Sequence, residues 1–220
     1  MKTLIITIDG PAASGKGTIA KFIKKKFNFF HIDSGLLYRK IAKIILDKKI
    51  NIKNSQEILK LIKNTKKINL INNKSLRTSK VTKMSSEIAK IQKIRNLINV
   101  NQKRIVKQNK GKYRGIVIDG RDIGSVVFKD AKIKLYIDTD KKIRAKRRFK
   151  ELIDKGERTI YSSVLKNIKL RDEKDKKRKN SPLTIPKGGI IIDNSCKLNQ
   201  TKKTIQKIIN QKLINRIKWH

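Results

Sequence analysis

Residues 3–18 constrain the fold more than any other part of the chain, because they join a buried strand to a glycine-rich loop and a helix. The run "TLIITI" at Thr3–Ile8 is apolar or β-branched throughout, which is typical of a central parallel strand covered on both faces. The loop "GPAASGKGT" follows at Gly10–Thr18, and the apolar residues after it have helical spacing: Ile19, Phe22, Ile23 and Phe27. A strand, a glycine loop and a helix in this order predict a phosphate-binding loop, in which backbone N–H groups and the helix N-terminus converge on an anion.

The bare spacing of the glycines and the lysine in this loop is weak evidence, since about 0.1 chance matches are expected in a chain so rich in lysine. Its place directly after the first buried strand makes an ordinary glycine turn a much less favoured interpretation. In the common pattern Ser or Thr follows the lysine directly, whereas here Gly17 stands between Lys16 and Thr18. The string "GKGT" resembles the nucleoside monophosphate kinases, in which the threonine still faces the phosphates or the metal. We therefore predict that the whole loop binds ATP, with the lysine bridging the transferring phosphates: Gly10, Pro11, Ala12, Ala13, Ser14, Gly15, Lys16, Gly17 and Thr18.

Four more short apolar runs predict strands, and helical patterns separate them. They are "FFHI" at Phe29–Ile32, "GIVI" at Gly115–Ile118, "IKLYI" at Ile133–Ile137 and "GIII" at Gly189–Ile192. The economical architecture is a three-layer α/β fold with a five-stranded parallel sheet between helices and a C-terminal amphipathic helix packed on the sheet. An aspartate follows each run, at the edge where ligands of such sheets bind: Asp33, Asp119, Asp138 and Asp193. We interpret the last two as helix or turn caps.

Two stretches interrupt this alternation, so that the core of a single domain comprises approximately 1–49, 105–155 and 183–220. Residues 50–104 lack strong strand patterning and predict a mostly helical insert, in which the string "KINLINNKSL" allows a short hairpin. Residues 156–182 are dense in charge and poor in apolar anchors, which predicts a mobile lid.

Lysine and arginine outnumber aspartate and glutamate by 58 to 17, and the net charge of +41 by itself favours a nucleic-acid or acidic-membrane partner. The basic residues are mostly lysine (45 against 13 arginines) and are spread along the chain, so compositional drift is the favoured interpretation. We expect weak non-specific binding to RNA but no specific nucleic-acid site. Under such drift the arginines are the informative cations, because lysine has not replaced them.

The single cysteine, Cys196, excludes an internal disulfide and favours a reducing compartment, and we expect it to pack beside a strand end. The apolar run near the N-terminus is too short for a signal peptide, and Asp9 interrupts it. No run approaches the roughly 18 apolar residues of a membrane span. We expect a cytoplasmic monomer without a membrane partner.

Four strings together resemble the bacterial cytidylate kinases, and the similarity runs from Thr3 to about Asn210. They are "IDGPAASGKGT", "IDSGLLYR" at Ile32–Arg39, "VIDGRDIGSVVF" at Val117–Phe128 and "LRDEKDKKR...PL" at Leu170–Leu183. The second and third are far more family-specific than the glycine loop. The resemblance implies a P-loop kinase core with an insert that binds the nucleoside monophosphate and with a mobile lid. It also implies phosphate transfer from ATP to CMP or dCMP, giving ADP and CDP or dCDP, with Mg²⁺ as cofactor.

The arginines in these strings suit phosphoryl transfer between two polyanions. An oxygen of the CMP phosphate is the nucleophile and is already anionic at neutral pH, so cations are needed and a general base is not. Planar arginine forks bind phosphate better than lysine does, which favours Arg39 and Arg121 for the CMP phosphate. Arg171 and Arg178, in the lid, are expected to close on the phosphates or the sugar as charge develops. The predicted catalytic residues are Lys16, Arg121, Arg171 and Arg178.

The resemblance assigns recognition of the cytosine base to Asp122 and Arg95, and Ser34 and Ser86 are expected to support them. A carboxylate accepts from the N4 amino group of cytosine and a cation donates to N3 and O2, whereas uracil would turn O4 against the carboxylate. Each residue also has a simpler interpretation. In these alternatives Ser34 caps a helix, Arg95 lies on the surface, and Asp122 only orients Arg121.

The resemblance also assigns Asp175 to the ribose hydroxyls, and the alternative is an exposed ion pair with Arg171, four residues earlier on the same helical face. Asp119 and Thr18 are candidates for contact with Mg²⁺ through water, and the alternative for Asp119 is a turn residue. The predicted CMP-binding residues are Ser34, Arg39, Ser86, Arg95, Arg121, Asp122, Arg171, Asp175 and Arg178.

One departure from the family and two rival functions also follow from the sequence. The insert of the family usually carries more β-strand before the segment matched by "LRTSKVTKMSSEIA", and "KINLINNKSLRT" compresses it here.

The first rival function is another small-molecule P-loop kinase, for adenylate, shikimate or dephospho-coenzyme A, and the strings "DSG...YR" and "DGRDIG" count against it. The second is a basic nucleic-acid-binding protein, but aromatic residues are only 5% and the arginines fall in the phosphate-site strings.

Overall fold

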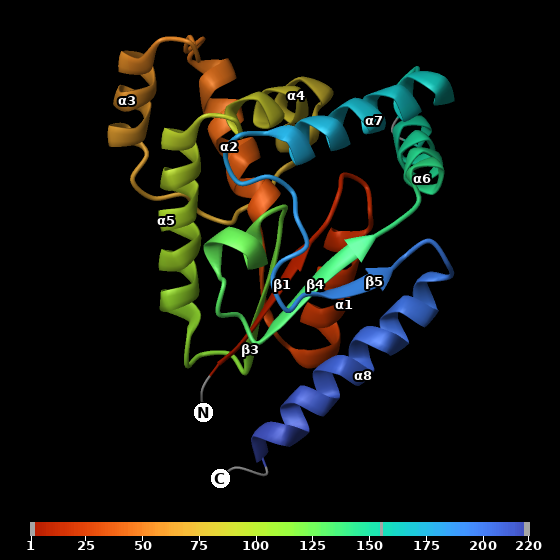
Figure 1. Cartoon of the computed structure of the whole chain (residues 1–220). Helices are drawn as coiled ribbons and strands as arrows, with labels where there is room; N and C mark the ends of the chain where they lie inside the picture. Colours follow the sequence, from red (N-terminus) through yellow and green to blue (C-terminus); the bar gives the residue numbers. More distant parts are fainter. Residues whose placement is uncertain (1–2, 155, 218–220) are drawn as a thin grey trace.

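Five parallel strands form the central sheet in the order β2-β3-β1-β4-β5, in a computed structural model that describes residues 3–154 and 156–217 (Figure 1). The strands are β1 (Leu4–Asp9), β2 (Phe30–Asp33), β3 (Gly115–Asp119), β4 (Ile133–Asp138) and β5 (Ile190–Asp193). The structure confirms each predicted strand to within one residue at either end. Because β3 and β4 pair with the two edges of β1, the strand that leads into the phosphate loop is the central one.

Helices cover both faces of this sheet, which confirms the predicted three layers. The helices α1 (Lys16–Phe27) and α8 (Leu198–Ile217) pack on one face, against apolar residues of β1 and β4. The helices α2 (Ser34–Asp47) and α5 (Gln92–Asn109) pack on the other face, over β2 and β3. The predicted C-terminal helix is therefore α8. Isoleucine, leucine and valine dominate both cores, so the hydrophobic effect rather than specific polar contacts holds the layers together.

Aspartates end all five strands, and the parallel register gathers them along one edge of the sheet. Asp33 lies opposite Asp119, and Asp138 lies opposite Asp193. Asp9, which the sequence analysis considered only as an interruption of an apolar run, ends the central strand beside the phosphate loop. Carboxylates therefore line the edge at which ligands bind in open parallel sheets.

Two of these aspartates cap turns, as expected. The Asp193 carboxylate accepts from the backbone N–H of Ser195 at 2.8 Å, and the Asp138 carboxylate accepts from that of Thr139 at 2.9 Å. The helix that follows β4, α6 (Lys141–Ile153), is capped instead by Asp140, which accepts from two backbone N–H groups of its first turn. Asp138 and Asp193 thus stabilise the loops next to the site without entering it.

The 50–104 segment is helical, but the hairpin allowed by its sequence is absent. It contains α3 (Ser55–Asn64), a 3₁₀ turn (η1, Lys74–Arg77), α4 (Ser79–Ile88) and the first part of α5. Between α3 and η1 the structure describes no strand.

Side chains of α5 take the place of a partner strand. Asn101, fully buried, accepts from the backbone N–H of Ile68 at 2.9 Å and donates to the Lys66 carbonyl at 3.4 Å. Arg104 donates to the Ile68 carbonyl at 3.1 Å. The backbone groups of Ile68 that a hairpin would pair are thereby satisfied from a helix.

The 156–182 segment contains α7 (Tyr161–Lys177), which packs on α6 at the carboxyl edge of the sheet (Figure 1). Of its few apolar anchors, Val164 and Ile168 are buried against Ala145 of α6, whereas Leu170 is exposed. The apolar contact is therefore confined to the first part of the helix.

The expectation that Cys196 packs beside a strand end is wrong. It follows β5 in a loop that runs over the surface toward α8, and its side chain is exposed. No helix in the described ranges combines the length and the apolar character that crossing a membrane requires.

Replacing Asn101 tests whether its side chain holds the strand-free segment between α3 and η1. Asn101→Leu keeps the size of the side chain but leaves the buried N–H of Ile68 and the half-buried Lys66 carbonyl without this partner. We expect the free energy of unfolding in urea to fall by about 2 to 4 kcal/mol. Asn96, exposed on the same helix, is the matched control, and Asn96→Leu should change stability by less than about 0.5 kcal/mol. Equal effects of the two changes would contradict the role of Asn101.

Candidate active site

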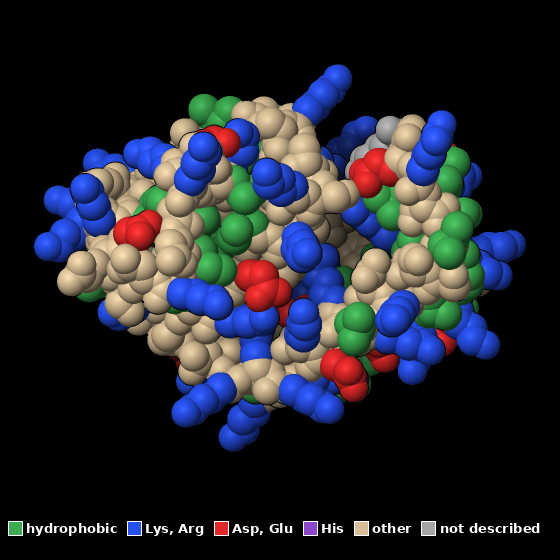
Figure 2. All heavy atoms as spheres, turned by 90° about the horizontal axis from the view of Figure 1, so that it is seen from above, with side chains coloured by type: hydrophobic (Ala, Val, Ile, Leu, Met, Phe, Trp, Pro, Cys, Tyr) green, Lys and Arg blue, Asp and Glu red, His purple; other side chains and the backbone are tan. Residues whose placement is uncertain are grey.

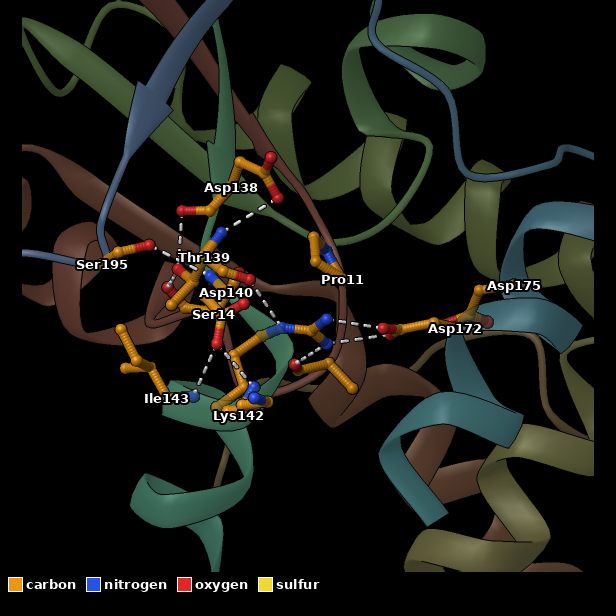
Figure 3. Close-up of polar contacts among 12 residues, drawn as sticks. Pro11, Ser14, Asp138, Thr139, Asp140, Lys142, Ile143, Asp172, Asp175 and Ser195 are labelled. Atoms are coloured by element: carbon orange, nitrogen blue, oxygen red, sulfur yellow. Dashed lines mark hydrogen bonds and ion pairs between the residues drawn. The ribbon is translucent and has the colours of Figure 1, made fainter. Parts of the chain in front are cut away.

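The phosphate loop between β1 and α1 has its carbonyl groups bonded to the surrounding scaffold. The Lys16 ammonium donates to the Pro11 carbonyl at 2.5 Å. Thr139 Oγ1 and Asn194 Nδ2 donate to the Ser14 carbonyl at 3.1 and 2.9 Å, and Figure 3 shows Ser14 and Thr139 together. The N–H of a trans peptide points away from its carbonyl, so these bonds leave N–H groups of the loop for an anion.

Gly15 begins α1 in a conformation that only glycine adopts readily at this position. Its φ of 90° is left-handed, and an added Cβ would lie 2.4 Å from Asn194 Nδ2. The loop therefore approaches the end of β5 more closely than any side chain at this position would permit.

Lys16 is buried, with 6% of its surface exposed. Desolvation lowers the pKa of its ammonium below the usual range, and the charge of Arg121 lowers it further, while Asp119 and Asp9 oppose the shift. A buried cation beside another cation is stabilised by an added anion. A polyphosphate bound at the loop would thus favour the charged form of Lys16.

Four predicted phosphate-binding arginines come together from three separate segments. Arg39 lies on α2, Arg121 follows β3, and Arg171 and Arg178 lie on α7 and at its C-terminal end. Burial lowers the pKa of Arg171 to about 10, and the charges of Arg121 and Arg39 contribute, so these guanidinium groups share one low-dielectric region. Figure 2 shows the face above the sheet, where basic side chains are widely scattered and some lie in a central hollow.

Asp175 is the carboxylate that holds these arginines together. It accepts from Arg121 Nε at 3.0 Å and lies 3.6 Å from Arg178 Nη1. Desolvation would raise its pKa, but the charges of Arg121, Arg171 and Arg178 outweigh this and lower the pKa. Its side chain is 18% exposed, so the alternative of an exposed pair with Arg171 is wrong.

Arg39 and Arg178 also keep unused donors. Arg39 bonds Asp33 at 2.8 Å, yet its Nε is buried and has no partner among the described residues. Arg178 Nη2 is likewise buried without a hydrogen bond in that part of the chain. Unsatisfied buried guanidinium donors are costly, and an anion between these arginines would satisfy them.

The predicted base-reading pair, Arg95 and Asp122, forms a buried ion pair. The Arg95 side chain is 1% exposed and also donates to the Ala89 carbonyl, so its alternative as a surface residue is wrong. Asp122 contacts Arg95 and lies 3.9 Å from Arg178, and no contact with Arg121 is found in the described residues. The alternative in which Asp122 only orients Arg121 is therefore not supported.

The two supporting serines differ in where they lie. Ser34 is buried at the start of α2, and its hydroxyl accepts from Gln102 Nε2 of α5 at 2.8 Å. Asp33, not Ser34, caps α2, because its carboxylate accepts from the backbone N–H of Leu36 at 3.0 Å. Ser86 donates to the Thr82 carbonyl in its own helix, and no contact with Arg95 or Asp122 is found among the described residues.

Asp119 stands between the phosphate loop and β2. Its Oδ1 lies 2.6 Å from His31 Nε2, and its Oδ2 lies 3.8 Å from where a Cβ on Gly17 would be. One carboxylate oxygen is thus beside the loop, while Thr18 is exposed on the first turn of α1. The described residues contain no cluster of three or more acidic, histidine or cysteine ligands for a metal. A single carboxylate oxygen and a hydroxyl fit Mg²⁺, which keeps several waters and takes other ligands from substrate phosphates.

Asp9 is a site residue that the sequence analysis missed. Its carboxylate accepts from the backbone N–H groups of Ile123 and Gly124, both at 2.7 Å, and so holds the loop that carries Arg121 and Asp122. Its position as the last residue of the central strand was the available signal, since the other strand-end aspartates were noted for that reason. Burial raises the pKa of this carboxyl to about 6, even though the two N–H groups lower it.

The raised pKa of Asp9 predicts a pH-dependent effect of Asp9→Asn. A carboxyl whose pKa rises from 3.8 to about 6 on folding contributes stability that is present below pH 4 and is lost as the pH rises through 6. The unfolding free energy of the wild type relative to the variant should therefore fall by about 2 to 3 kcal/mol between pH 4 and pH 7. Urea unfolding of both proteins at the two pH values measures this, and a difference independent of pH would contradict it.

Comparison with known proteins agrees with this geometry. The family model described as cytidylate kinase matches residues 6–218. The cytidylate kinase of Fusobacterium nucleatum subsp. nucleatum is 38% identical over 233 residues, which cover 99% of this chain and 100% of that protein. The cytidylate kinase of Rickettsia felis is 39% identical and covers 86% of this chain and 84% of its own length. That of Caldicellulosiruptor saccharolyticus is 34% identical, with coverage of 97% and 95%.

A solved structure supports the fold at lower identity. An uncharacterised protein from Eubacterium ventriosum aligns with a TM-score of 0.54 at 19% identity and covers 94% of this chain and 99% of its own. The family match spans nearly the whole chain, and the relatives are covered over most of their length. The chain therefore belongs to the cytidylate kinase family.

Proposed function

We propose that this protein transfers the γ-phosphate of ATP to CMP or dCMP and releases ADP with CDP or dCDP. The observation that carries the proposal is the buried Arg95–Asp122 pair, which lies next to a group of arginines with unused donors. The pair suits the cytosine base, and the arginines suit the phosphate attached to it. Membership in the cytidylate kinase family supports the same reaction.

The reaction needs positioning and charge stabilisation more than proton transfer. An oxygen of the CMP phosphate attacks the γ-phosphate of ATP and carries its negative charge already, so no side chain has to remove a proton. We assign Lys16 to the transferring phosphates and Arg39 and Arg121 to the CMP phosphate. Arg171 and Arg178 would stabilise the charge that develops between the two nucleotides, and their burial strengthens that interaction.

The base is recognised by complementary donors and acceptors. In this proposal Asp122 accepts from the N4 amino group of cytosine, and Arg95 donates to N3 or O2. Arg95 Nε is buried and has no partner in the described chain, which leaves a donor for the base. Uracil presents an acceptor where cytosine presents the amino group, so it would face the carboxylate unfavourably. Ser34 and Ser86 are placed near the base only by the family resemblance.

The remaining assignments complete the two nucleotide sites. Asp175 is held ionised by its arginines and would accept from the ribose hydroxyls of CMP. Asp119 and Thr18 would hold Mg²⁺ through water, and the ion supplies charge neutralisation on the ATP phosphates when bound. We infer that the 50–104 segment is the insert that binds CMP and that the 156–182 segment is a mobile lid. A cytoplasmic monomer is consistent with these roles and remains a proposal.

Substrate choice tests the proposal directly. We expect ADP release from Mg-ATP when CMP or dCMP is offered at moderate salt. With UMP or AMP we expect at least about 10-fold lower kcat/KM, because neither base matches the acceptor of Asp122 and the donors of Arg95 as cytosine does. A coupled assay with each acceptor offered separately measures this. Lys16→Ala is the inactive control: it should remain folded but no longer transfer phosphate from ATP to the acceptor. Wild-type turnover in that variant would remove the loop from the reaction, and no turnover with any acceptor would overturn the proposal.

Asp122→Asn tests base recognition apart from catalysis. An amide can donate to O4 of uracil, so the ratio of kcat/KM for CMP to that for UMP should fall about 10- to 100-fold. Asp130→Asn changes an exposed carboxylate eight residues away and is the matched control. Since loss of charge at a buried pair also destabilises the fold, the ratio is the readout rather than the absolute rate. An unchanged ratio in folded Asp122→Asn would remove Asp122 from base recognition.

A further inference from the structure

Arg144 is a buried arginine of α6 whose guanidinium group bonds three separate segments of the chain. Its Nε donates to the Thr139 carbonyl at 2.9 Å, in the turn between β4 and α6. Its Nη1 donates to the Ala12 carbonyl of the phosphate loop at 3.1 Å. The same nitrogen and Nη2 donate to the two carboxylate oxygens of Asp172 on α7, at 3.0 and 2.6 Å (Figure 3). One planar group, 5% exposed, thus joins the loop, the sheet edge and α7.

The bond to Asp172 fixes how α7 is rotated about its own axis. Two parallel bonds between a guanidinium and a carboxylate hold both groups in one orientation, unlike a single contact. Neighbouring helical positions differ by about 100°, so holding Asp172 also sets the directions of Arg171 and Asp175. Those directions bring Asp175 to Arg121, at 3.0 Å.

Apolar packing holds only the first half of α7 directly. The cluster that α7 shares with α6 contains Val164 and Ile168, which precede Arg171. The ring contact of Tyr161 with Phe149 is also at the beginning of the helix. From Arg171 to Lys177 every residue is charged, so polar bonds must orient that part. Among the described residues of this part, Asp172 makes the first such bond along the helix, to Arg144.

The loop end of this connection lies beside the predicted phosphate-binding lysine. Lys16 bonds the Pro11 carbonyl, and Arg144 bonds the carbonyl of the next residue, Ala12. A phosphate that draws the Lys16 ammonium away from Pro11 therefore acts on a peptide adjacent to the one that Arg144 holds. Because Arg144 Nη1 is shared between Ala12 and Asp172, a change at the loop reaches α7 through one nitrogen atom.

We propose that Arg144 and Asp172 are positioning residues that couple nucleotide binding at the phosphate loop to the orientation of α7. Through this pair, Arg171 and Asp175 are aligned when the loop holds the phosphates of ATP. The kinetic consequence rests on the proposed function, whereas the coupling itself requires only that the loop binds a nucleoside triphosphate. Neither residue touches the reacting atoms in this proposal.

Hydrogen exchange tests the coupling without any turnover. With a non-hydrolysable ATP analogue and Mg²⁺, backbone amides of the wild type should exchange more slowly both in residues 10–18 and in residues 161–177. In Asp172→Asn the loop should still respond, but α7 should not. Glu173→Gln is the matched control, because this neighbouring carboxylate is 63% exposed and pairs only across one turn with Lys177. An α7 that responds in Asp172→Asn as in the control, or that fails to respond in the wild type, overturns the proposal.

Kinetics then test whether the pair acts through Arg171. Asp172→Asn should lower kcat about 10- to 100-fold, and the KM for ATP should change much less, because the loop itself is intact. Adding Arg171→Ala to Asp172→Asn should cost clearly less than Arg171→Ala costs in the wild type, since the alignment is already lost. If the two substitutions instead lower kcat by independent factors that multiply in the double variant, the mechanism is overturned. The two proposals can fail separately. If the wild type does not phosphorylate CMP but the hydrogen-exchange result is as expected, the proposed function fails and the coupling stands.

A second variant keeps the proposal testable if Asp172→Asn unfolds. Arg144→Lys retains the buried positive charge but cannot bond Ala12, Thr139 and Asp172 together, because an ammonium lacks the planar fork. It should reproduce the loss of the α7 response and the loss of kcat. A folded Arg144→Lys with wild-type exchange and wild-type kcat overturns the coupling.

Discussion

Desolvated positive charge is the constraint on which the rest of this site depends. Lys16 and four arginines meet at the carboxyl edge of the sheet, and burial lowers the pKa of Lys16, Arg171 and Arg178. Charges of one sign at low dielectric repel strongly unless carboxylates or a bound anion offset them. Asp122 and Asp175 do so only in part, since buried guanidinium donors remain unsatisfied within the described residues. The fold therefore holds a site whose electrostatics favour the binding of phosphates.

The sequence revealed those parts of the fold and the site that depend on local pattern. Each strand is an apolar run, so all five were predicted to within one residue at either end. The predicted phosphate loop and the arginines of α7 lie in short strings, and their roles stay predictions. The sequence did not reveal the role of Arg144 or of Asp9, because the bonds of Arg144 to Ala12 and Asp172 and those of Asp9 to the loop after β3 span 28 or more residues and form no pattern along the chain. The hairpin prediction failed for a related reason. Asn101 satisfies the backbone of Ile68 from a distant helix, and spacing alone cannot indicate such a bond.

The lysine-rich composition and the arginine-rich site have one physical explanation. Among the described lysines only Lys16 is buried, whereas buried ion pairs at the site use the guanidinium groups of Arg95 and Arg144. An exposed cation needs only charge and solvation, which lysine supplies, but Arg144 makes bonds in several fixed directions. Lysine is thus sufficient over the surface, whereas arginine is needed where the geometry of the donor matters.

Helix α5 contacts both the buried Asp122 and the strand-free segment between α3 and η1. Near its start α5 places Arg95 against Asp122, and about two turns later Asn101 bonds Ile68 of that segment and Gln102 bonds Ser34. A helix is stiff over this length, so the bonds of Asn101 and Gln102 also help to fix the position of Arg95. The orientation of the buried Arg95–Asp122 pair therefore depends on how firmly α5 is held by the segment that precedes η1.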